Sequence, residues 1–317
     1  MSSVVRWLIA AAVAVAVVVG VVAAALLVPG GSQRSGDSQS SGVRQRMADR
    51  AATVRFAGGP VRGVLYVQVG RDPNYDDAYR LSGDPSRARR LTTNGRLSTI
   101  SAQPGRVVVA DARGSGSDRA ETLDLAAKGD ALPGRLIDPA GQTPVLSRSG
   151  KVAYVVPQYG PNGSDAGTSL FVAPYEGGPK RLRYRARTDL GSPTWLPGDR
   201  LAVISDPDTP KAKVVLDPGT PRQRAVDPPF SGAYGLQASA AGELYVANAR
   251  RLALLTRTGK LRGAPIDHQP VGWALDGRRV LVVDGRDLGL LDPDSGRVKP
   301  LLHTDGPTIG GVSWVER

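Results

Sequence analysis

The sequence predicts an all-β protein built from repeated units, and three observations lead to this prediction. A short phrase recurs, in which a tight turn containing Gly is followed by a run of Val, Leu or Ala. After residue 28, no segment of useful length has the apolar spacing of a helix. The turn glycines Gly105, Gly150, Gly198, Gly242 and Gly277 lie 35 to 48 residues apart. A four-stranded propeller blade takes ~40–50 residues, and stacked copies bury faces that one copy cannot. We therefore predict a β-propeller.

The N-terminal part of the chain carries a long apolar segment. Residues 7–28 contain no charged side chain, and as a helix they would extend about 33 Å, enough to cross a bilayer core. A cleavable signal peptide is the alternative, but its apolar region is usually shorter, about 7–15 residues, and the residues before Pro29 make a poor cleavage site. We predict a transmembrane helix, or an uncleaved signal, over 7–28, after a cytoplasmic N-terminus over residues 1–6.

A flexible linker and an exported domain are predicted to follow. Residues 29–53 are rich in Gly, Ser, Gln, Arg and Asp, which cannot bury a core. Residues 54–317 form the propeller. Arginines after the apolar segment would, by simple counting, keep this part inside the cell, but large domains translocate largely regardless of charge. We expect a single-pass protein of the cell membrane with the propeller on the extracytoplasmic side.

Each repeat contains signals for four strands. In one repeat, an aliphatic run over 151–154 follows the turn glycine, and a second run covers 170–174. A Gly-Gly turn at 176–178 then leads into a short last strand over 181–184. The other repeats read in the same way.

The two ends of the domain predict how the ring closes. Residues 311–315 read as an innermost strand with no blade after it, whereas 62–69, 78–81 and 88–91 read as a blade that lacks its innermost strand. The C-terminal strand should complete that blade, which gives six blades and leaves short, protected edges.

The best repeat resembles a known family. Residues 192–203 read S-P-T-W-L-P-G-D-R-L-A-V, similar to the TolB-like, WD-repeat-like repeat P-x-W-S-P-D-G-x-x-I-A-F. Gly177-Gly178 and Arg90-Leu91-Thr92 match later parts of that repeat. The chain is also similar to the propeller half of membrane-anchored actinobacterial lipoproteins of the LpqB kind, although it lacks their lipid-bearing Cys and has no room for their N-terminal domain. The resemblance implies a binding scaffold outside the cytoplasm, with no catalysis.

Composition excludes several kinds of chemistry. The chain has no Cys, which excludes disulfides, thiolate metal sites and Cys nucleophiles. The net charge is +12, and two explanations stay open: the Arg-rich composition of a high-GC genome, which we favour, or attraction to anionic surfaces. No basic stripe with interleaved aromatics is present, so we predict no nucleic-acid partner.

The chain also lacks signs of a catalytic site. There is no G-x-S-x-G elbow, and the predicted innermost strands carry no acid that could hold a metal in the central channel. His268 and His303 are interpreted as solvated loop residues rather than metal ligands. We therefore predict no catalytic residue, no metal and no cofactor.

Propeller topology assigns the loops to two faces. The first face, as we call it, carries the turns between the second and third strands and the connections between blades; the second face carries the other turns. The Asp- and Asn-rich first-face loops have two interpretations, turn formation and ligand binding, and a calcium site is a weaker alternative. The candidate ligand-binding residues are Asp72, Asn74, Asp76, Asp77, Asn162, Asp165, Asp206 and Asp208.

The second face holds many arginines and few acids, including Arg106, Arg148, Lys151, Arg200, Arg278 and Arg279. Because the first blade begins at its second strand, the linker is expected to enter on this face. The basic face would then lie toward the anionic membrane or wall, unless turns are simply where Arg occurs in this sequence.

Three functions follow as hypotheses. The first is a membrane-anchored, non-catalytic scaffold that binds an envelope protein or a cell-wall component. The second is a calcium-dependent propeller hydrolase or lactonase, and the third is a structural subunit of an envelope complex. The oligomeric state is not predicted.

Overall fold

A computed structural model describes residues 54–70, 76–92, 97–113, 117–123, 133–162, 164–239, 241–248, 251–255 and 261–316. These residues form strands joined by turns, with one 3₁₀ turn, η1 (Pro85–Arg87). Among them, no helix is long and apolar enough to cross a membrane. The predicted N-terminus, anchor and linker, residues 1–6, 7–28 and 29–53, lie outside the described residues.

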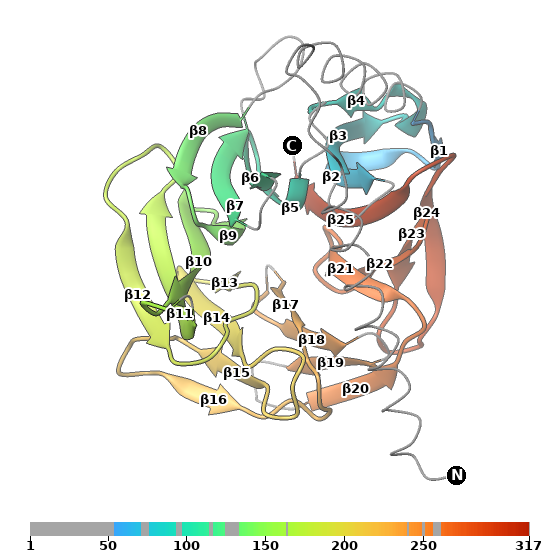
Figure 1. The fold of residues 1–317 in the computed structure, drawn as a ribbon. Coiled ribbons are helices and arrows are strands. Elements are labelled where there is room, and N and C mark those ends of the chain that lie inside the picture. Colours follow the sequence, from blue (N-terminus) through green and yellow to red (C-terminus); the bar gives the residue numbers. More distant parts are fainter. Residues whose placement is uncertain are drawn as a thin grey trace, which may run out of the picture. The chain divides into compact units, whose positions relative to one another are not determined.

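The strands form antiparallel groups of four around a common centre (Figure 1). We call each group a blade and give its strands from the centre outward. Blade 1 contains β25 (Thr308–Val315), β2 (Val61–Gly70), β3 (Asp76–Gly83) and β4 (Arg89–Arg90). Blade 2 contains β5 (Leu97–Gln103), β6 (Arg106–Arg113), β7 (Ser117–Leu123) and β8 (Pro133–Asp138). Blade 3 contains β9 (Gln142–Leu146), β10 (Lys151–Tyr159), β11 (Asp165–Pro174) and β12 (Arg181–Ala186).

The remaining blades follow the same order. Blade 4 contains β13 (Thr194–Leu196), β14 (Arg200–Ser205), β15 (Lys213–Leu216) and β16 (Arg224–Val226). Blade 5 contains β17 (Gly235–Ala238), β18 (Leu244–Asn248), β19 (Arg251–Leu255) and β20 (Leu261–Pro265). Blade 6 contains β21 (Gln269–Trp273), β22 (Val280–Asp284), β23 (Asp287–Leu291) and β24 (Val298–Thr304). The predicted all-β fold is confirmed.

The backbone at the turn glycines explains the recurring phrase. All five have φ between 63° and 85°, a left-handed conformation that glycine adopts without steric cost. Each lies in the turn from the innermost to the second strand of its blade. The second strands are covered on both faces by neighbouring blades; in β14, Leu201 to Ile204 are all buried. A strand buried on both faces reads as a continuous aliphatic run, which is the run that follows each turn.

The last strand of the chain completes blade 1, as the sequence predicts. β25 pairs with β2 in antiparallel register, from Val64 opposite Val315 to Gly70 opposite Thr308. Apolar side chains of β25, β2 and blade 6 then share one cluster that includes Leu65, Val67, Leu281, Ile309 and Val312.

An additional strand, β1 (Phe56–Gly58), which the repeat pattern does not predict, pairs with the outer edge of blade 6. Phe56 lies opposite Thr304, where β24 ends on the first face. The backbone of Arg55 donates to the Asp305 carboxylate at 2.9 Å and accepts from the Asp305 N–H at 3.1 Å. The described chain therefore begins on the first face. The expectation that the linker enters on the second face is wrong, because β1 brings the chain across before β2 starts.

Side-chain hydroxyls on the innermost strands join neighbouring blades. In three places, a backbone N–H of one innermost strand donates to a Ser or Thr hydroxyl of the preceding blade. The three bonds are Ala102 to Ser313 (2.9 Å), Leu146 to Ser101 (3.0 Å) and Ala238 to Thr194 (3.0 Å). The indoles of Trp195 and Trp273 add bonds to the carbonyls of Val145 and Gln237, at 3.0 and 3.2 Å. The polar positions of the repeat thus hold the ring together.

Candidate functional site

The predicted ligand-binding residues fall into three groups. Asp72 and Asn74 lie outside the described residues. Asp76 and Asp77 are buried at the start of β3. The other four, Asn162, Asp165, Asp206 and Asp208, lie on loops or loop ends of blades 3 and 4.

The side chains of Asp76 and Asp77 form hydrogen bonds and an ion pair inside the ring. Asp76 Oδ2 accepts a hydrogen bond from Gln68 Nε2 at 2.7 Å, and the same nitrogen donates to Leu97 O of blade 2 at 2.8 Å. Asp77 forms an ion pair with Arg90 at 2.8 Å and accepts from Thr92 Oγ1 at 3.0 Å. Because β3 begins at Asp76, the first-face loop ends two residues earlier than the sequence pattern indicates.

The hairpin between β10 and β11 exposes several residues on this face. Tyr159 ends β10 with a side chain that is 69% exposed, and it lies opposite Asp165 in the ladder. Gly160 N–H donates to Ser164 O at 2.7 Å, which closes the turn that carries Asn162. The Asp165 carboxylate accepts from Gly167 N–H at 2.9 Å, so its direction is fixed.

The loop between β14 and β15 has an unusual backbone. Asp206 and Asp208 have φ of 51° and 62°, a region that is sparsely populated by residues other than glycine. Their N–H groups donate to Asp189 O at 2.9 Å and to Ala233 O at 3.1 Å, in the connections before and after blade 4. Backbone hydrogen bonds therefore hold three loops together as one surface. This surface and the Tyr159 hairpin together form what we call the acidic loop surface.

The acidic loop surface carries carboxylates at its rim, together with the exposed cations Arg187 and Lys211 of the same loops. Asp189 and Asp208 are exposed, and Asp206 is half-buried. Burial raises the pKa of Tyr234, and the nearby Asp208 carboxylate raises this pKa further, so the phenol keeps its proton and can act as a donor. Within the described ranges, no group of three or more His, Asp or Glu side chains is placed to hold a metal ion.

The two histidines lie apart from this surface. His303 lies on β24, not in a loop as the sequence predicts, and its Nδ1 is 2.8 Å from Asp287 Oδ1. His268 lies in the connection between β20 and β21.

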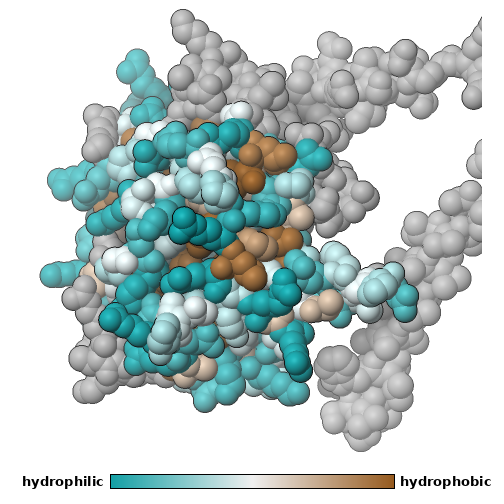
Figure 2. All heavy atoms as spheres, turned by 90° about the vertical axis from the view of Figure 1, so that its left-hand side faces the viewer, coloured by the Kyte–Doolittle hydropathy of each residue, from teal (hydrophilic) through white to brown (hydrophobic). Residues whose placement is uncertain are grey.

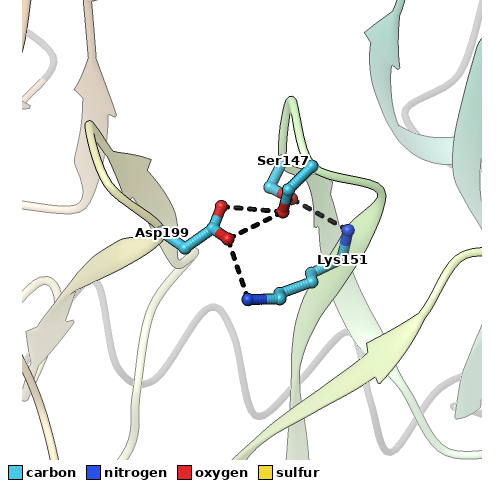
Figure 3. A network of polar contacts seen from close by, with 4 residues as sticks. Ser147, Lys151 and Asp199 are labelled. Carbon is cyan, nitrogen blue, oxygen red and sulfur yellow. Dashed lines mark hydrogen bonds and ion pairs between the residues drawn. The ribbon is translucent and has the colours of Figure 1, made fainter.

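Several cations of the second face form ion pairs with carboxylates. Figure 3 shows Asp199 of blade 4 accepting from Lys151 Nζ, at 2.8 Å, while Ser147 Oγ accepts from the Lys151 N–H. Asp199 also accepts from Ser149 Oγ at 2.8 Å. Arg106, Arg200 and Arg279 also form ion pairs, with Glu176, Asp217 and Asp276. Of the six cations named above for this face, four are thus paired with acids.

The outer edges of blades 2 and 3 expose apolar side chains. Leu136 of β8 is 46% exposed and Leu182 of β12 is 51% exposed. Figure 2, seen from the side that carries β8 and β12, shows apolar patches among polar residues. Single exposed leucines are common on protein surfaces and need no functional explanation.

Tyr159, Asp189 and Tyr234 belong to the acidic loop surface and are not among the predicted residues. Tyr159 stands directly before Gly160-Pro161-Asn162, so an aromatic next to a turn could have marked it. Asp189 and Tyr234 have no local signal, because their places depend on contacts between loops that are distant in the sequence.

Comparison with known proteins shows the fold. No family model matches the chain, and no curated protein matches it. The structure is similar to TolB from Acinetobacter baumannii, with a TM-score of 0.64 and 14% sequence identity over 80% of this chain and 67% of that one. It is also similar to a protein of unknown function from Bacteroides caccae, with a TM-score of 0.57 and 11% identity over 80% of this chain and 98% of that one. The chain therefore has a TolB-like β-propeller fold.

Proposed function

We propose that this protein is a six-bladed propeller, anchored in the cell membrane by residues 7–28, that binds an envelope protein or a cell-wall component outside the cytoplasm without catalysing a reaction. The acidic loop surface is its binding site. The observation that carries this proposal is the exposure of Tyr159 on a hairpin whose strand β11 contacts the loop of Asp189, through Thr168, beside loops with a fixed backbone. Exposed Tyr beside polar loop residues is typical of protein-binding surfaces, where aromatic anchors supply much of the affinity.

The chemistry of the described residues supports binding rather than catalysis. The innermost strands carry Ser, Thr and Trp, whose polar atoms hold neighbouring blades together. None of the innermost strands of the described ring contains Asp or Glu. The buried acids Asp76 and Asp77 are bonded inside blade 1. A calcium-dependent hydrolase needs carboxylates that converge on the channel, and this arrangement does not supply them.

The binding proposal is tested by crosslinking the full chain in its native membranes and identifying what is captured. Tyr159→Ala removes the exposed ring, and Asp208→Gly removes a carboxylate while glycine adopts the backbone at φ 62°. Each variant should reduce the captured partner by about tenfold or more, the effect of losing an interface anchor. Leu182→Ala, at an exposed side chain on the outer edge of blade 3, should capture as much as the natural chain. Equal capture by all four proteins would refute the site.

Two further measurements test the rest of the proposal. Protease added to intact cells should digest the propeller, and complete protection would place it inside. Calcium titration followed by thermal unfolding should give little stabilisation. A large upward shift of Tm would instead support the calcium-dependent enzyme, since a ligand that binds the folded state raises its stability.

A further inference from the structure

A pocket of about 320 Å³ opens on the second face between blades 4 and 5. Leu196, Leu216, Leu244 and Leu255 line its wall, and all four belong to the buried core between these blades. Arg200 and Arg224 also line the pocket. The volume is at the lower end of the range for small-molecule sites, roughly 300–1,000 Å³. The pocket therefore has room for one aliphatic chain beside two guanidinium groups.

Aromatic side chains occupy the second-face end of two other junctions. Between blades 2 and 3, the Arg106 guanidinium lies over the Tyr175 ring at 5.5 Å. Between blades 5 and 6, the rings of Tyr245 and Trp273 lie 5.7 Å apart. The junction of blades 4 and 5 has leucines at its lining instead, which leaves the space open.

The two arginines have different roles. Arg200 is held by Asp217 through a bidentate pair, with Nε 2.9 Å from Oδ1 and Nη2 2.6 Å from Oδ2. Its charge is balanced, and its position is fixed. Arg224 is exposed and makes no ion pair with any residue of the described ranges. The pocket thus combines an apolar wall with one uncompensated positive charge, and a charge-assisted hydrogen bond from a guanidinium favours a carboxylate or phosphate oxygen.

We propose that this pocket binds a single aliphatic chain that ends in an anionic head group, with the chain against the four leucines and the head group on Arg224. A neutral aliphatic molecule would not form the charge-assisted hydrogen bond to Arg224, and a cationic one would be repelled by it. The site lies on the face opposite the acidic loop surface, so it stands or fails independently of the function proposed above.

Photolabelling tests this proposal with the full chain in phosphatidylcholine vesicles. The probe is decanoate with a diazirine at the end of its chain, and labelled peptides are mapped by mass spectrometry. Labels should concentrate in residues 196–200, 216–224 and 244–255. Unlabelled decanoate should compete, and decanol should compete about tenfold more weakly, as the loss of one charge-assisted bond implies. Labels spread evenly over the exposed surface, or equal competition by decanol, would overturn the proposal.

Matched variants distinguish binding of the probe in the pocket from a general attraction of the anionic probe to a basic protein. Arg224→Gln should lower the labelling about tenfold, while Arg224→Lys should retain most of it. Arg222→Gln removes an exposed charge of the same kind two residues away, outside the pocket lining, and should change nothing. Equal losses in Arg222→Gln and Arg224→Gln would show that only net charge matters, and the proposed site would be wrong.

Discussion

A buried tyrosine makes the stability of this ring depend on pH in the alkaline range. Tyr79 is 4% exposed and packs edge-on against Phe56, with 5.3 Å between the ring centroids. Burial raises the pKa of Tyr79 to about 12; Arg90 opposes this rise, and the Asp77 carboxylate adds to it. Because the folded state holds the phenol proton more tightly than the unfolded state, this stabilisation is complete below pH ~10 and is lost as the pH rises toward 12.

We predict that the free energy of unfolding falls between pH 10 and pH 12, with on the order of 2–3 kcal/mol of the loss due to Tyr79. Urea unfolding at a series of pH values measures this directly. Tyr79→Phe keeps the ring and removes the titrating group, so its stability should fall less steeply over the same interval. Parallel curves for the two proteins would show that Tyr79 does not contribute.

At the scale of the strands, the hydroxyl bonds between blades carry a second prediction. Thr194 is buried, and its hydroxyl accepts from the Ala238 N–H at 3.0 Å. Thr194→Val keeps the shape but leaves this N–H without an acceptor, which should lower the free energy of unfolding by about 1–2 kcal/mol. The exposed Thr188→Val is the control and should stay within about 0.5 kcal/mol of the natural chain. Faster hydrogen exchange of the Ala238 amide in Thr194→Val would locate the effect, and unchanged exchange would contradict it.

The added strand β1 makes a third prediction. The strand β1 is short, with three residues, but its Phe56 is 3% exposed and packs into the cluster shared by blades 6 and 1. Phe56→Ala should therefore cost about 3–5 kcal/mol, the usual effect of removing a buried aromatic ring. Thermal unfolding measures the loss, with Leu182→Ala as the exposed control. A Tm equal to that of the natural chain would mean that β1 does not anchor the start of the domain.

At the scale of the whole molecule, local patterns predict the blades, and long-range contacts determine what those patterns miss. The turn glycines and the aliphatic runs are set by backbone geometry within each repeat, so the sequence shows them. The pairing of β1 with β24 joins residues more than two hundred positions apart, and no local signal marks it.

The candidate site likewise has features that the local sequence predicts and features that depend on long-range contacts. Asp206 and Asp208 are predicted from their turn composition, but the bonds that join them to Asp189 and Ala233 depend on the folded ring. The sequence shows the charges of the second face but not their pairing, because ion pairs such as Lys151 with Asp199 and Arg200 with Asp217 join different blades or different strands.

Ring closure is the property of the whole molecule that one deletion can test. β25 is the innermost strand of blade 1 and also contacts β5 and β21 of the neighbouring blades, so its loss would open the ring and expose the edge of β2. A chain that ends at Gly310 lacks Val312 and Val315, which are both buried, and keeps every other blade. We predict that this chain loses the single cooperative unfolding transition and aggregates through the open edge. A chain that lacks Glu316 and Arg317, beyond the end of β25, should unfold like the natural one. Cooperative unfolding of both shortened chains at the same midpoint would show that the ring does not depend on β25.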